Sequence, residues 1–127
     1  MNLEKVVFGF FVLLAATLNF GYFVGDISDP AQHNIHELYA AVAVNLIATV
    51  LKFGDRTQLG AIHLATSLVA SIQLIAAVTV WIYATEVIGH PTVHIISSVV
   101  SLSAGALLAN IVSVILMITE TVSYRRR

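Results

Sequence analysis

The sequence predicts an all-α polytopic membrane protein with four transmembrane helices, and two observations support this fold class. The chain has 127 residues, of which 58% are hydrophobic and 10% charged, and its mean hydropathy is +0.92. Because a soluble domain is typically about 25% charged, this composition indicates a lipid environment. The second observation is a series of four apolar runs separated by turn residues, each long enough for a span of about 20 residues. We therefore expect one domain that covers residues 1–127.

The predicted helices cover residues 3–24, 34–53, 58–87 and 92–124. The first run is too long for the apolar core of a signal peptide, so we expect it to remain as the first helix. Asn34 is expected to cap the second helix, with Glu37 at the spacing of a capping box. Trp81 and Tyr83 lie near the end of the third helix, where amphipathic aromatic side chains favour the membrane interface.

The basic residues predict the orientation of the chain. With helices that alternate in direction, one side of the membrane receives every lysine and arginine: Lys5, Lys52, Arg56, Arg125, Arg126 and Arg127. By the positive-inside rule, both termini would be cytoplasmic, as expected for a protein of a bacterial inner membrane. The three C-terminal arginines could also bind anionic lipid headgroups.

The opposite side carries acidic and histidine side chains. Asp26, Asp29, Glu37 and Glu86 would form an acidic outer mouth that concentrates cations. Two loops on this side could also converge on a transition metal, because neutral imidazoles bind such metals; the ligands would be His33, His36, Glu86, His90 and His94. Pro91 argues against this site, since it favours a helix start that leaves His90 outside. The histidines could instead be solvated, or respond to pH.

Small residues recur at every fourth position of the predicted fourth helix: Ser97, Ser101, Gly105, Ala109 and Ser113. In lipid, small side chains at this spacing let two helix backbones approach closely, so we expect this stripe to pack against another helix. Further small residues, among them Ser103 and Ala106, lie on other sides of the helix. We therefore expect a homo-oligomeric bundle.

Four amides lie within the apolar spans: Asn19, Asn45, Gln73 and Asn110. An unpaired amide in hydrocarbon is costly, so each is expected to face protein or water. They could line a pore, with Thr49 and Asn45 completing a polar seam toward Asn110. Alternatively, they could serve only as hydrogen bonds between helices.

A weak internal repeat aligns residues 44–51 with residues 109–116 and makes Asn45 the counterpart of Asn110. Such a repeat predicts two parallel hairpins related by a pseudo-twofold axis along the membrane normal.

Two ionisable side chains lie close to the predicted cytoplasmic side. His63 is one turn inside the third helix and is followed by Thr66, Ser67 and Ser71, so it could relay protons. It could equally pack against a neighbouring helix. Glu120, near the end of the fourth helix, is expected to pair with a basic residue.

In the segments VNLIATVLKFGDR (residues 44–56) and ALLANIVSVIL (residues 106–116), the chain resembles an uncharacterised family of small four-helix bacterial inner-membrane proteins with no assigned activity. The resemblance implies the architecture and supplies no mechanism.

Several function classes are not supported by the sequence. The absence of cysteine excludes disulfides, thiolate metal sites and dithiol redox chemistry. A net charge of −1 without a basic face does not favour nucleic-acid binding. No phosphate-binding loop or catalytic triad pattern is present, so we expect neither catalysis nor a cofactor.

The expected function is that of an oligomeric ion channel or ion-transport protein with cation preference. Two alternatives stay open. The chain could be a non-catalytic accessory subunit of a larger membrane transporter or channel, or an outward-facing metal- or pH-responsive membrane protein.

Overall fold

The computed structural model describes residues 3–24, 35–53, 57–89 and 92–125. They form α1 (Leu3–Phe23), α2 (Ile35–Lys52), α3 (Gln58–Tyr83), the π-helix η2 (Ala84–Ile88) and α4 (Val93–Arg125). When η2 is counted with α3, four helices are long and apolar enough to cross a membrane. The all-helical fold class is therefore confirmed, and the four apolar helices suggest a membrane location. The helix bounds lie within one residue of those expected.

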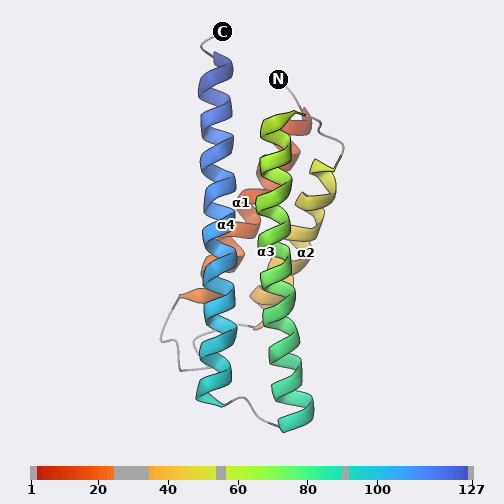
Figure 1. Cartoon of the computed structure of the whole chain (residues 1–127), viewed down its shortest axis with the longest axis vertical. Coiled ribbons are helices and arrows are strands. Elements are labelled where there is room, and N and C mark those ends of the chain that lie inside the picture. The colour runs from red at the N-terminus through yellow and green to blue at the C-terminus, as the bar shows by residue number, and fades with distance from the viewer. Residues whose placement is uncertain (1–2, 25–34, 54–56, 90–91, 126–127) are drawn as a thin grey trace.

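Consecutive helices run in opposite directions, and α4 returns beside α1 (Figure 1). Each helix packs mainly on two others: α1 and α3 both contact α2 and α4. Both ends of the chain lie at the same end of the bundle, which we call the terminal end (Figure 1). The other end, where α3 leads into α4, is called the opposite end.

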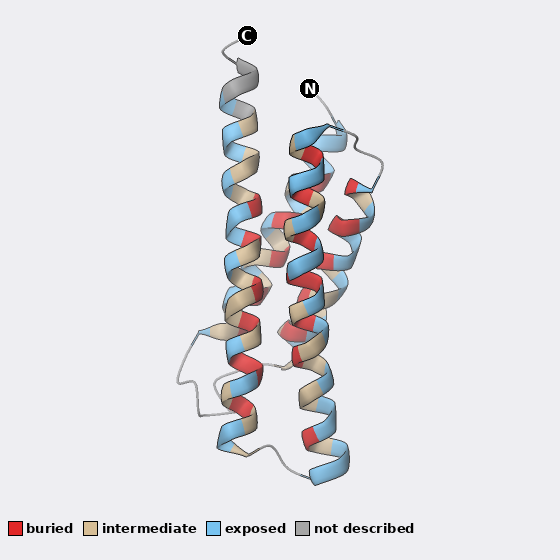
Figure 2. Ribbon diagram, viewed as in Figure 1, coloured by how far each residue is buried: buried red, intermediate tan, exposed pale blue. Residues whose placement is uncertain are grey.

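Buried positions alternate in spacing between three and four residues, and Figure 2 shows them on the faces that the helices turn toward one another. The series are Phe8, Val12, Ala15, Asn19 and Tyr22 in α1; Leu38, Ala41, Asn45, Ala48 and Lys52 in α2; Gly60, His63, Ser67, Ala70, Leu74 and Ala77 in α3; and Ile96, Val99, Ser103, Ala106, Asn110 and Ser113 in α4. This is the spacing of the core positions in four-helix bundles and coiled coils.

Side-chain contacts near the terminal end fix the register of the four helices. The Phe8 ring lies 4.4 Å from the Lys52 ammonium and 5.2 Å from the His63 ring, measured to the ring centroids. Met117 of α4 lines the same cavity as Phe8 and Lys52. Together these residues form one layer of the core, with one side chain from each helix.

A second layer lies seven residues, or about two helical turns, deeper in the bundle. It consists of Ala15, Asn45, Ala70 and Asn110, and we call it the central layer. Its two alanines are fully buried, and the two amides come from α2 and α4. Small side chains at two corners leave room for the amides at the other two.

Between the terminal end and the central layer the core contains both apolar and polar side chains. The buried apolar ones are Phe8, Val12 and Ala48. The buried polar side chains here, which we call the polar half-core, are Asn45, Thr49, Lys52, His63, Ser67, Ser71, Asn110 and Ser113. Toward the opposite end the core becomes apolar. This apolar half-core includes Tyr22, Leu38, Leu74, Ala77, Ile96, Val99 and Val100. Its buried polar side chains among the described residues are Asn19 and Ser103.

The ends of α3 are set by local hydrogen bonds. Thr57 caps its first turn, because the Gly60 N–H donates to the Thr57 hydroxyl oxygen over 2.9 Å. At the other end, η2 stops at Gly89, whose φ of 101° is in the left-handed region that favours glycine. The Gly89 N–H donates to the Ala84 carbonyl oxygen over 3.0 Å. The expected cap at Asn34 lies outside the described residues.

The stripe of small residues expected on α4 is only partly a packing face. Ser113 is buried, and Gly105 lies beneath the Gln73 amide, whose nitrogen would be 2.8 Å from a Cβ at that glycine. Ser97 and Ala109 are half-buried, whereas Ser101 is exposed and is not buried against another helix of this bundle. Positions four apart advance by about 400°, so such a stripe winds by about 40° per step around the helix. Alternating steps of three and four stay on one face.

The central layer predicts that replacing an alanine of α3 by leucine lowers the free energy of unfolding at a buried position and not at an exposed one. Ala70→Leu adds volume to a fully buried position and should lower the free energy of unfolding by about 1–3 kcal/mol. Ala65→Leu, on the exposed side of the same helix, should change it by less than about 0.5 kcal/mol. Unfolding in mixed detergent micelles, followed by circular dichroism, measures both. Equal effects would contradict the burial of Ala70.

Candidate functional site

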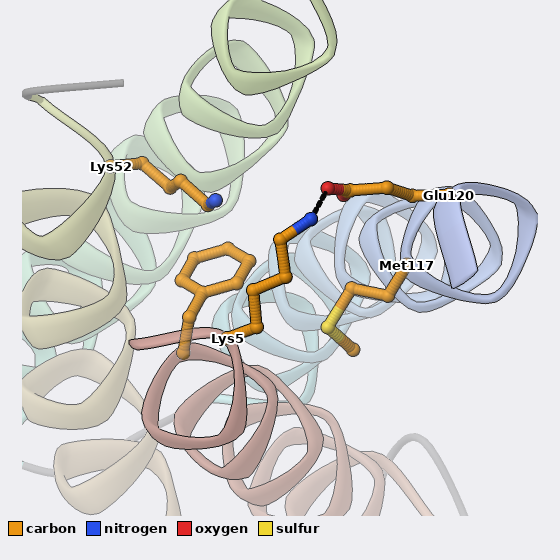
Figure 3. Close-up of a pocket in the computed structure, with 5 residues that line it drawn as sticks. Lys5, Lys52, Met117 and Glu120 are labelled. Carbon is orange, nitrogen blue, oxygen red and sulfur yellow. Dashed lines mark hydrogen bonds and ion pairs between the residues drawn. The ribbon is translucent and has the colours of Figure 1, made fainter. Parts of the chain in front are cut away.

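A cavity of about 60 Å³ opens at the terminal end of the bundle. Its lining comes from three helices and consists of Lys5, Phe8, Lys52, Met117 and Glu120 (Figure 3). This volume has room for a few water molecules. The cavity lies at the start of the polar half-core.

Glu120 lies between two potential positive charges. One carboxylate oxygen accepts a hydrogen bond from the Lys5 ammonium, as Figure 3 shows, and the other lies 3.7 Å from His63 Nε2. The side chains of Lys5 and Glu120 are 52% and 27% exposed, so the pair contributes at most about 1 kcal/mol. His63 is 1% exposed. The carboxylate thus joins the cavity to a buried imidazole, and the expected pairing of Glu120 with a basic residue is observed.

Lys52 was not anticipated as a core residue. It is 8% exposed, and its ammonium lies over the face of the Phe8 ring. A cation over an aromatic ring gains about 0.5–2 kcal/mol, depending on how far it is desolvated. The signal was present in the sequence, because Lys52 continues the buried series seven residues after Asn45.

Two pairs of hydroxyl groups lie deeper in the polar half-core. The Thr66 hydroxyl donates to the His63 carbonyl oxygen over 3.0 Å and also contacts the Ser113 hydroxyl of α4. The Thr49 hydroxyl of α2 lies 3.2 Å from that of Ser71 in α3. Since a hydroxyl can both donate and accept, these pairs link neighbouring helices with groups that can change hydrogen-bond direction.

The amides of the central layer differ in their hydrogen bonding. Asn45 Nδ2 donates to the carbonyl oxygen of Ala41, one turn earlier in its own helix, over 3.0 Å. Asn110 is 2% exposed, and within the described part of the chain its Nδ2 has no hydrogen-bond partner. A buried donor without a partner costs about 1–3 kcal/mol. The central layer therefore retains hydrogen-bonding capacity for a water molecule or a ligand.

Gln73 and Asn19 have different surroundings. Gln73 lies over Gly105, and its Oε1 has no partner among the described residues. The Asn19 amide lies 2.6 Å from the Ser103 hydroxyl, so it links α1 to α4 on the apolar side of the central layer. Asn19 thus has the role of an interhelical hydrogen bond.

The expected acidic mouth at the opposite end is described only in part. Glu37 packs against Gly21, where an added Cβ would overlap the carboxylate, and Glu86 is exposed. Asp26 and Asp29 lie outside the described residues.

The predicted metal ligands are not brought together within the described part of the chain. His36, Glu86 and His94 are exposed, while His33 and His90 lie outside the described residues. In the part that the structure describes, no three histidine or acidic side chains could hold a metal ion. The lipid-binding prediction for Arg125, Arg126 and Arg127 concerns side chains outside that part.

The bundle defines a class of protein: a small four-helix protein whose helices are long and apolar enough to cross a membrane, with most of its buried polar side chains between the terminal end and a central amide layer. The chain belongs to DUF6394, a family of unknown function, whose model matches residues 32–121. This range includes both segments that carry the resemblance to an uncharacterised family, so that resemblance is confirmed. No curated protein and no solved structure matches the chain.

The contact between Asn19 and Ser103 predicts a measurable coupling energy. In a double-mutant cycle of Asn19→Ala and Ser103→Ala, we expect the unfolding free energies to couple by about 0.6 kcal/mol, and by no more than about 1.7 kcal/mol, as is typical of such bonds in membranes. A control cycle combines Asn19→Ala with Ser113→Ala, because Ser113 bonds instead to Thr66. Similar coupling in both cycles would contradict the assignment.

Proposed function

We propose that the chain is an ion-transport protein with cation preference, and that the polar half-core is the part of its pathway reached from the terminal end. One observation carries this proposal: buried polar side chains extend from the terminal cavity to Asn45 and Asn110 in the central layer. Polar groups within a membrane are expensive and are characteristic of ion and substrate pathways.

The unmet hydrogen bond of Asn110 supports a role beyond helix packing. Asn19, which does link helices, has a partner at 2.6 Å, whereas Asn110 Nδ2 has none in the described chain. A side chain that serves only packing would have its buried donor paired, because the low dielectric makes an unpaired group costly. Asn110 therefore suits transient contact with water or a permeating species.

The apolar half-core requires the proposed pathway to be gated. Leu38, Leu74 and Val99 are fully buried between the central layer and the opposite end. An apolar constriction of this kind excludes water and blocks ions until it widens. Transport would thus require a rearrangement of the helices at the opposite end.

We further propose that both termini are cytoplasmic in a bacterial inner membrane and that several copies assemble. Lys5 and Lys52 lie at the terminal end, in agreement with the positive-inside rule. Ser98 and Ser101 are exposed on α4 and would let a second copy approach closely. In this proposal the two halves of the chain are parallel hairpins, with Asn45 and Asn110 as counterparts.

Labelling of single cysteines tests the orientation, since the chain has no cysteine of its own. Gln58 and Val93 are exposed residues at the terminal and opposite ends. A membrane-impermeant maleimide should label Val93→Cys in intact cells and Gln58→Cys only after lysis. The reverse pattern would contradict cytoplasmic termini.

Transport itself is tested with purified protein in liposomes, by recording currents on a solid-supported membrane under gradients of H⁺, Na⁺, K⁺ and Cl⁻. We expect cation currents that fall roughly tenfold or more in Asn45→Leu and Asn110→Leu, which corresponds to a barrier increase of at least about 1.4 kcal/mol.

Ala65→Leu is the matched control, because it places the same side chain on the exposed side of α3. It should retain the wild-type current. A monodisperse wild-type protein that carries no current for any of these ions would overturn the proposal. Equal losses in Ala65→Leu and Asn110→Leu would also contradict it.

A further inference from the structure

We infer that the transported cation is the proton, and that His63 and Glu120 form the site at which it enters the polar half-core. The inference rests on the proposed transport function and names its substrate. It starts from a buried imidazole, 1% exposed, whose Nε2 lies 3.7 Å from the carboxylate of Glu120.

The two side chains occupy successive positions between water and the core. Glu120 is 27% exposed and lines the terminal cavity, whereas His63 lies behind it against the edge of the Phe8 ring. A proton taken from cavity water would bind the carboxylate and then pass to Nε2, with the O–H bond breaking as the N–H bond forms. Release of the Nδ1 proton to a water molecule that enters the polar half-core would leave a neutral imidazole and an ionised carboxylate. The imidazole suits this exchange because one ring nitrogen can accept a proton while the other donates one.

The charged groups around the pair disfavour other ions. Lys5 from α1, Lys52 from α2 and Glu120 from α4 are the charged side chains that line the cavity next to His63. Two ammonium groups at the entrance repel metal cations, and the Glu120 carboxylate repels an anion at the next step. A proton instead bonds to the carboxylate oxygen and neutralises it, so it enters as part of a side chain and not as a separate ion.

Two hydroxyl pairs lie deeper in the polar half-core. Thr66 and Ser113 are in direct hydrogen-bond contact, and Thr49 lies 3.2 Å from Ser71. At these separations no metal ion or chloride fits between the two oxygens. A proton needs no such space, since each hydroxyl can accept one proton and donate another. The polar half-core is thus too closely packed for a hydrated ion and suited to hydrogen-bonded transfer.

The experiment uses wild-type protein in liposomes that contain a pH-sensitive dye, with a potassium gradient and valinomycin to set the membrane potential. We expect wild-type protein to change the internal pH in the direction that the potential drives. Glu120→Gln and His63→Gln should slow this change by roughly a hundredfold, the lower range for loss of a positioned proton-transfer group. Glu120→Asp, which keeps the carboxylate, should restore a large part of the rate.

Matched controls use side chains that do not line the cavity. Glu4→Gln and His94→Gln remove the same functional groups from exposed positions and should retain the wild-type rate. If His63→Gln does not fold, as judged by gel filtration and circular dichroism, the comparison of Glu120→Gln with Glu120→Asp decides the question.

The outcomes separate this inference from the proposed function. A current of Na⁺, K⁺ or Cl⁻ without proton movement would overturn the inference and leave transport standing. Wild-type proton flux in both Glu120→Gln and His63→Gln would overturn the assigned site. Absence of flux for every ion would overturn transport and the inference together.

Discussion

A polar side chain within a membrane must find its partners inside the protein, and this requirement decides which face of each helix turns inward. Asn19, Asn45 and Asn110 are at most 2% exposed, although they lie in three different spans. Lipid solvates an apolar face as well as protein does, so leucine and valine alone would leave the rotation of these helices weakly determined. The amides remove that freedom, because turning any of them toward lipid would leave it without a partner.

Small buried residues determine how closely the helices can pack. Four alanines are fully buried: Ala15, Ala41, Ala70 and Ala77. Each belongs to the buried series of its helix, which also contains polar or large side chains. Without a hydrophobic driving force between helices, close packing supplies much of the association energy, and alanine lets backbones approach. The apolar half-core thus holds the bundle together through packing, while the polar half-core accepts unpaired groups such as Asn110 Nδ2.

The helices and their limits could be predicted from the sequence because length, hydropathy and turn residues are local properties of the chain. The burial of Asn45 and Asn110 was expected for the same reason, since no polar partner exists in lipid. The contacts of Lys52 and Glu120 depend instead on the register between helices. Lys52 contacts Phe8, and His63 lies close to Glu120, and each pair joins two different helices. The sequence of one helix does not specify how far it is shifted along its neighbour. Ser101 is exposed although it belongs to the stripe of small residues on α4. Positions spaced by four residues wind around a helix, whereas positions spaced alternately by three and four residues stay on one face.

The side chains near the terminal cavity contact one another, although they come from all four helices. Phe8 contacts both Lys52 and His63, and Glu120 faces both Lys5 and His63. A proton on His63 would strengthen its attraction to Glu120 at the expense of the exposed pair with Lys5, which itself contributes little. The arrangement of this end of the bundle thus depends on one carboxylate, which contacts a half-exposed ammonium on one side and a buried imidazole on the other.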